Sequence, residues 1–78
     1  MSHIAPVHYK KLARVFELSG FVLDRREGDH LVYVKEGTKR PVVIPTYKQV
    51  PVFIIKNNLR SARISREEYF QLLKVPVD

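Results

Sequence analysis

An imidazole in a tight turn is the feature of this sequence with the clearest chemical capability. His30 follows Gly28 and Asp29, and the three residues separate two runs rich in β-branched and apolar residues. Glycine permits the backbone of a tight turn, so the turn would deliver the imidazole to the rim of a small sheet. Imidazole transfers protons near neutral pH, which makes His30 a candidate general acid or base. The alternative interpretation is a hydrogen-bonded histidine at a strand edge.

Other reactive residue types are scarce, which narrows the kind of site. The two remaining histidines, His3 and His8, lie near the N-terminus, and the chain has no cysteine. Thiolate nucleophiles and thiolate metal sites are therefore excluded. No two histidines share a predicted face and no carboxylates cluster with His30, so we expect neither a metal nor another cofactor. The sequence also lacks a glycine-rich phosphate loop, a nucleophile elbow and a dinucleotide fingerprint.

Basic residues dominate the charge of the chain. Fourteen Lys and Arg against eight Asp and Glu give 78 residues a net charge of +6, and the sequence pI is about 9.9. Such an excess attracts polyanions, RNA among them, although it could also serve solubility alone. The candidate RNA contacts are the turn residues Gly28 and Asp29 and the cations Arg25, Arg26, Lys35, Lys39, Arg40 and Lys48. Each cation could equally be a solvated surface charge.

Two tyrosines lie where they could support a site at His30. Tyr33 follows His30 in the same strand-like run, and Tyr47 lies in the polar loop after the next one. Either ring could stack on a base or orient the imidazole, although a tyrosine in a strand more often serves packing.

Length and composition favour one small domain over residues 1–78, with its core at about 7–73 and frayed ends. A chain this short cannot enclose an ordinary active-site cavity, so chemistry should take place on an open surface. No apolar run has the length of a membrane helix, and the first residues lack the pattern of a signal peptide. We therefore expect a cytoplasmic protein without membrane contacts.

Hydrophobic periodicity predicts the elements that must position these residues. Helical spacing of apolar residues predicts a helix over Val7–Ser19 that ends at Gly20. A period of two predicts three antiparallel strands within Phe21–Pro45, the last at a sheet edge because prolines flank it. Two more helices follow, one opened by Pro51 and one by a capping box at Ser65.

The predicted order is α-β-β-β-α-α, an α+β fold with helices on one face of a three-stranded antiparallel sheet. This order is close to the double-stranded-RNA-binding-domain architecture, which binds RNA by shape and phosphate contacts. Alternation places His30 with Val32 and Val34, and Leu31 with Tyr33 on the opposite face. Both faces carry apolar groups, so the pattern leaves open which face meets solvent.

Three blocks of residues between about Tyr9 and Leu73 resemble the HicA toxins, small mRNA interferases with a double-stranded-RNA-binding-like fold. The blocks are Leu18-Ser19-Gly20-Phe21, then Gly28-Asp29-His30 with Tyr33 following, then Leu59-Arg60-Ser61-Ala62-Arg63-Ile64-Ser65 leading into Glu67-Glu68-Tyr69. The resemblance implies the toxin of a type II toxin–antitoxin system that cleaves mRNA. It also implies that His30 is catalytic, since the family's second block is typically Gly-Ser-His, and that an acidic HicB-like antitoxin is the partner.

Four positions depart from the family's pattern. Asp29 stands where serine is usual, and its carboxylate would either weaken the attraction for phosphate or favour the protonated imidazole. Tyr47 stands where a second histidine is usual, while Phe53 and Arg63 replace common glycines. Two functions therefore stay open. One is a metal-independent endoribonuclease with His30 as general acid or base; the other is a non-catalytic RNA-binding module, or a degenerate toxin that only binds its antitoxin.

Overall fold

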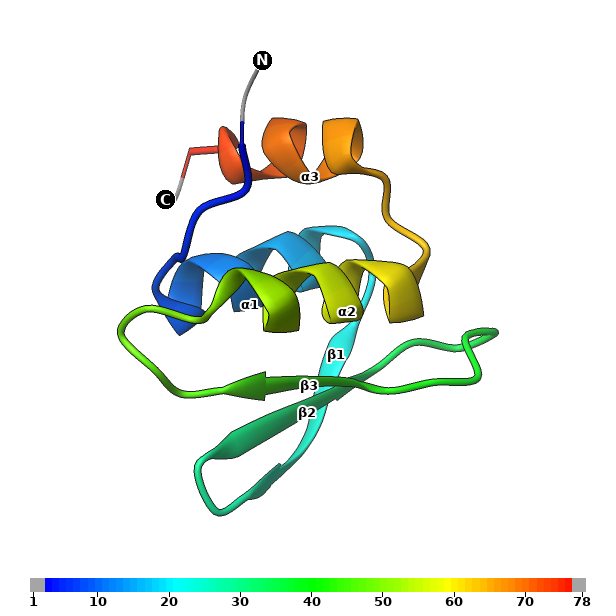
Figure 1. Ribbon diagram of the computed structural model, residues 1–78. Helices are drawn as coiled ribbons and strands as arrows, with labels where there is room; N and C mark the ends of the chain where they lie inside the picture. Colours follow the sequence, from blue (N-terminus) through cyan, green and yellow to red (C-terminus); the bar gives the residue numbers. More distant parts are fainter. Residues whose placement is uncertain (1–2, 77–78) are drawn as a thin grey trace.

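Six elements make up the fold in the computed structural model, which describes residues 3–76 (Figure 1). In chain order they are α1 (Tyr9–Leu18), β1 (Val22–Glu27), β2 (His30–Val34), β3 (Val42–Pro45), α2 (Val52–Ala62) and α3 (Arg66–Leu73). The predicted α-β-β-β-α-α order and the α+β class are confirmed. The frayed ends expected from the sequence fall partly on residues 1, 2, 77 and 78, which lie outside the described residues.

The sheet is an antiparallel meander with β2 in its centre. His30 pairs with Glu27 on one side and with Pro45 on the other, so both neighbouring strands meet at the residue that begins β2. The register of β1 shifts between Leu23 and Arg25. β3 is an edge strand, as its flanking prolines predicted, because proline cannot donate a hydrogen bond to a further strand.

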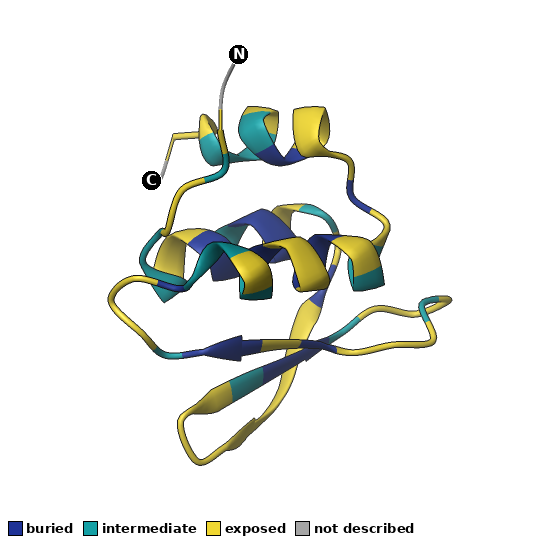
Figure 2. Cartoon of the chain, in the orientation of Figure 1, coloured by how far each residue is buried: buried dark blue, intermediate teal, exposed yellow. Residues whose placement is uncertain are grey.

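The helices lie on one face of the sheet, and α3 packs against α1 (Figure 1). The core between these layers contains Leu12 and Phe16 from α1, Val42 and Ile44 from β3, and Ile55 from α2, each fully buried. Figure 2 shows this burial on the sides where the helices and the sheet face each other. Burying side chains of this size contributes about 1.5–3 kcal/mol each. The core therefore fixes the sheet that carries His30.

The start of α1 differs from the prediction by two residues. Val7 forms a β-bridge with Val50 instead of a helical turn, and the Val50 N–H donates to the Val7 carbonyl at 2.7 Å. His8 is the N-cap residue, and its Nδ1 accepts a hydrogen bond from the Lys10 N–H at 3.1 Å. The helix ends as predicted before Gly20, whose φ of +98° suits glycine. The bridge joins the N-terminal segment to the loop before α2.

The ends of α2 and α3 follow different local rules. Pro51 is the N-cap residue of α2 rather than its first helical residue. Ser65 caps α3 as predicted, since its Oγ accepts a hydrogen bond from the Glu68 N–H at 3.0 Å. Between the two helices, Arg63 adopts φ 58° and ψ 40°, a left-handed conformation. Helices commonly end at such a residue, but it is usually glycine, which has no Cβ to strain.

Candidate active site

His30 lies on the face of the sheet that the helices leave uncovered. Leu31 and Tyr33 pack into the core cluster, so His30 and Val32 belong to the opposite face. Val43, which pairs with Val32, is 39% exposed on that face. The imidazole is exposed as well. The question that alternation alone left open is therefore answered: His30 faces solvent.

Two hydrogen bonds hold the His30 turn against the loop that follows β3. The Asp29 carbonyl accepts from the Thr46 N–H at 2.8 Å and from the Thr46 Oγ1 at 2.9 Å. The Asp29 side chain is exposed. Tyr47, the next residue of the loop, is 46% exposed. The structure thus brings the turn together with Thr46, which is far from it in the sequence. The Tyr47 carbonyl itself accepts from the Tyr9 N–H at 3.1 Å.

Two arginines of β1 make contacts in the turn and in the strand that leads to it. Arg26 Nε donates to the Gly28 carbonyl at 3.1 Å, and Gly28 has a φ of +57°. Arg25 pairs with Glu27 and, at 2.6 Å, with Asp24. The hydrogen bond that Arg25 donates to Glu27, followed by the one it donates to Asp24, raises the pKa of Arg25 above its usual value. Two carboxylates offset the charge of Arg25. Arg25 pairs with Val32 and so belongs to the face of His30, whereas Arg26 pairs with Leu31 and belongs to the opposite face.

The other predicted cations divide between the two ends of the sheet. Lys48 is exposed two residues after Thr46, at the end where His30 lies. Lys35, Lys39 and Arg40 follow β2 and precede β3, roughly 15 Å away along the strands at about 3.3 Å per residue. The Lys35 ammonium lies 5.7 Å from the centre of the Phe21 ring. Of the predicted cations, Lys48, Arg25 and Arg26 therefore lie at the His30 end of the sheet.

Tyr33, predicted as a possible supporting residue, lies on the face of the sheet opposite His30. Its side chain is 3% exposed and faces the helices, and its hydroxyl donates to Glu17 Oε2 at 3.0 Å. Burial, followed by this hydrogen bond, raises its pKa from 10.0 to about 12. A ring on the covered face can neither stack on a base beside His30 nor orient the imidazole. Its partner on α1 lies 16 residues earlier, where no local pattern shows it.

Replacing Tyr33 with phenylalanine should lower the free energy of unfolding by about 1 kcal/mol, because a hydrogen bond to a partly exposed carboxylate is lost. The raised pKa means that the hydroxyl's contribution is complete below pH 10.0 and is lost as the pH approaches about 12. Tyr33→Phe should therefore reduce the alkaline loss of stability, as measured by urea unfolding at several pH values. Unchanged RNA cleavage is expected; a folded variant with impaired cleavage would return Tyr33 to the site.

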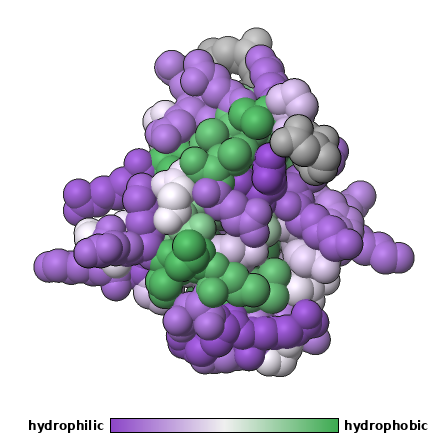
Figure 3. All heavy atoms as spheres, turned by 180° about the vertical axis from the view of Figure 1, so that it is seen from behind, coloured by the Kyte–Doolittle hydropathy of each residue, from purple (hydrophilic) through white to green (hydrophobic). Residues whose placement is uncertain are grey.

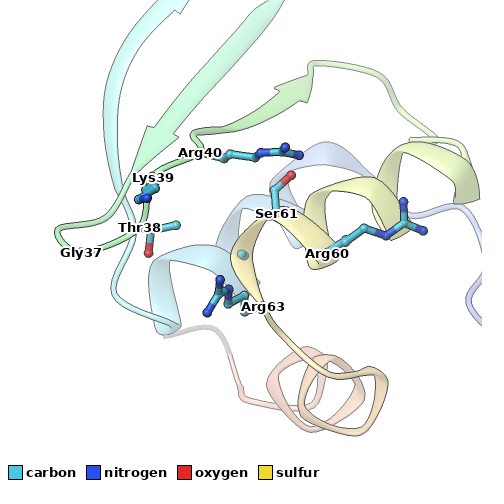
Figure 4. Close-up of a pocket in the computed structure, with 8 residues that line it drawn as sticks. Gly37, Thr38, Lys39, Arg40, Arg60, Ser61 and Arg63 are labelled. Carbon is cyan, nitrogen blue, oxygen red and sulfur yellow. The ribbon is translucent and has the colours of Figure 1, made fainter.

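Lys39 and Arg40 line a pocket together with two further arginines, which the sequence pattern does not connect with them. Arg60 and Arg63, at the end of α2, help to line a pocket of about 420 Å³ beside the β2–β3 loop (Figure 4). Its other lining residues are Gly37, Thr38, Ser61 and Ala62. Arg60 is in the last turn of α2, whereas Arg63 follows the helix in a left-handed conformation. The pocket that both arginines line together with the loop arises only from tertiary packing.

Potential metal ligands do not gather anywhere in residues 3–76, where no group of three or more His, Asp or Glu side chains could hold an ion. None of the described helices has the length and apolar character needed to cross a membrane. Figure 3 shows one face of the molecule, on which hydrophilic side chains surround two apolar areas.

A comparison with protein families identifies a match over most of the chain. The model of the family described as the HicA toxin of bacterial toxin-antitoxin matches residues 9–64. The matched segment contains α1, the whole sheet with the His30 turn, and α2. No curated protein matches the chain. Because the family match covers well over half of the 78 residues, the chain belongs to the HicA toxin family and has the role of the toxin in a toxin–antitoxin system.

Proposed function

We propose that this toxin is a metal-independent endoribonuclease that cleaves mRNA with His30 as general acid or base. The observation that carries the proposal is an exposed imidazole on the helix-free face, at a turn braced by Thr46 and Arg26. A braced turn holds a proton-transferring group in place for an extended substrate. An open face suits RNA, which a closed pocket in so small a domain could not enclose.

RNA carries its own nucleophile, so the protein has little chemistry to supply. A base takes the proton of a ribose 2′-hydroxyl, and the resulting oxygen attacks the adjacent phosphorus. The bond to the 5′-oxygen then breaks and that oxygen takes up a proton, which leaves a 2′,3′-cyclic phosphate and a 5′-hydroxyl. His30 can take the first proton or give the second. Lys48 is the nearby cation suited to the charge on the phosphate, because Arg26 pairs with Leu31 on the opposite face of the sheet.

Tyr47 is a candidate for a second group that acts with His30. Its backbone adjoins Thr46, which binds the turn, and its side chain is 46% exposed. By the family resemblance this loop usually carries a second histidine. A phenol can donate a hydrogen bond to a leaving oxygen or stack on a base. We therefore propose Tyr47 as the second group of the site.

A second candidate function follows from two departures from the family's pattern, at Tyr47 and at Asp29. With Tyr47 in place of a histidine, the site offers one imidazole for two proton transfers, and the exposed Asp29 carboxylate repels phosphate. A toxin altered in this way could bind RNA, or only its antitoxin, without cleaving RNA. Binding and cleavage must therefore be measured separately.

The decisive experiment incubates the purified protein with a long mRNA in the presence of EDTA. We expect fragments with 2′,3′-cyclic phosphate and 5′-hydroxyl ends. A matched RNA with a 2′-deoxy sugar at a mapped cleavage site should resist cleavage there, because the nucleophile is missing. Cleavage of the deoxy site, or cleavage that EDTA abolishes, would contradict the mechanism. RNA binding without any cleavage would favour the second candidate function.

A further inference from the structure

The pocket between the β2–β3 loop and the end of α2 is unusual in its charge. Four of its eight lining residues are cations, namely Lys39, Arg40, Arg60 and Arg63, and none is a carboxylate. None of the four forms an ion pair with another residue in the described part of the chain. The hydroxyls of Thr38 and Ser61 add two uncharged hydrogen-bond donors. This donor set fits an anion.

Arg63 occupies a backbone position that favours glycine. Its φ of 58° is the one positive value among the described residues other than glycine. A side chain in this conformation costs about 1 kcal/mol relative to glycine. The chain nevertheless carries an arginine here, which places a guanidinium at the pocket (Figure 4). Local strain of this kind tends to accompany functional sites.

The dipole of α2 accounts for only some of the four cations that line the pocket. A cation in the last turn of a helix, such as Arg60, is stabilised by the free carbonyl groups there. Lys39 and Arg40 belong to the loop instead, and they lie across the pocket from the helix end (Figure 4). The Thr38 N–H donates to the Lys35 carbonyl at 3.0 Å, which closes that loop. Four like charges around one cavity repel one another, and a bound anion would offset this repulsion.

We propose that this pocket binds a backbone phosphate of the RNA strand that is presented to His30, an inference that rests on the proposed function. β3 begins at Val42, two residues after Arg40, and ends at Pro45, which pairs with His30. Four strand residues span roughly 13 Å. Because β3 is an edge strand, an RNA strand laid along that edge reaches the pocket at one end and the His30 turn at the other.

The lining of the pocket favours phosphate over an acidic protein. Protein interfaces are anchored by aromatic and large apolar side chains at their centres. Ala62 is the only lining residue with an apolar side chain. Guanidinium groups, in contrast, bind phosphate through two parallel hydrogen bonds, and three arginines contribute to the lining of the pocket.

The test compares variants for their binding of a 2′-O-methyl RNA, which lacks the nucleophile and cannot be cleaved. Arg40→Ser and Arg63→Gly remove cations from the pocket, and Lys11→Ser removes an exposed cation of α1 as the matched control. Each pocket variant should bind more weakly and should reduce the slope of log affinity against log salt by about 0.7. Lys11→Ser should leave that slope unchanged. Arg63→Gly should also raise the melting temperature, so its weaker binding cannot reflect unfolding.

Each alternative has its own outcome. Unchanged affinities and slopes in both pocket variants would overturn the proposal, whether or not His30 is catalytic. Amide shifts on titration with inorganic phosphate, without a change in RNA binding, would indicate a site for small anions only and would also overturn it. If the pocket variants lost antitoxin binding but kept RNA binding, that result would also overturn the proposal. Reduced slopes in a protein that never cleaves RNA would support the pocket and reject the proposed catalysis.

Discussion

His30→Ala is expected to lower the rate of RNA cleavage by about 10²–10⁴-fold, the usual contribution of a general acid or base. The fold should persist, because the side chain is exposed and lies outside the core. A surface substitution of this kind changes the free energy of unfolding by no more than about 0.5 kcal/mol. Cleavage, circular dichroism and urea unfolding should be measured on one preparation of each protein.

His8→Ala is the matched control, because His8 is a histidine with a structural role and lies outside the candidate site. His8 caps α1 through a hydrogen bond from the Lys10 N–H. Its loss should lower the free energy of unfolding by about 1 kcal/mol and leave cleavage intact. The two variants should thus show opposite patterns. Full cleavage by a folded His30→Ala protein would show that the imidazole has no catalytic role.

Much of the fold was predictable because its signals are local. The capping box at Ser65, the glycine after α1 and the prolines around β3 each act within a few residues of their own position. The start of α1 was missed because the Val7–Val50 bridge joins residues far apart in the chain. Periodicity records which residues are apolar, and it contains no information on such a pairing.

The site was predictable only at its centre. The glycine turn indicated an exposed His30, but both faces of β2 carry apolar residues, so the sequence could not assign the imidazole to a face. The contact of Thr46 with the turn and the pairing of Tyr33 with Glu17 both depend on tertiary packing. Charge alone could not separate Lys48 at the His30 end from Lys39 at the opposite end of the sheet. Cations in one sequence region can serve different surfaces.

The antitoxin partner that family membership provides should be sought on the helix-free face. Val22 and Val43 pair with Val34 and Val32 of β2, so both belong to the same face as His30. They are 62% and 39% exposed. Protein interfaces commonly have an apolar centre and a charged rim. Two exposed valines beside basic residues meet that description, and we propose an acidic HicB-like protein as the occupant.

We expect that an acidic protein is encoded next to this toxin and that it forms a tight complex that stops cleavage and protects the His30 turn from hydrogen exchange. The net charge of +6 should speed association with an acidic partner and make that rate fall as salt increases. Co-expression, size exclusion, exchange measurement and a cleavage assay test these points together. Protection should extend from the turn to β1 and β3, because their exposed valines lie on the same face of the sheet as His30.

Two matched variants locate the interface. Val22→Ser removes an exposed apolar side chain from the helix-free face, whereas Phe53→Ser removes one that is 66% exposed on α2. Only Val22→Ser should weaken the complex, because the antitoxin must cover His30 to exclude RNA and α2 lies on the other side of the sheet. If the neighbouring protein does not bind, or binds while the His30 turn exchanges freely and cleavage continues, occlusion is not the mechanism. If only Phe53→Ser weakened the complex, the antitoxin would bind the helices. Inhibition would then have to act through the sheet, because the antitoxin would not cover His30 directly.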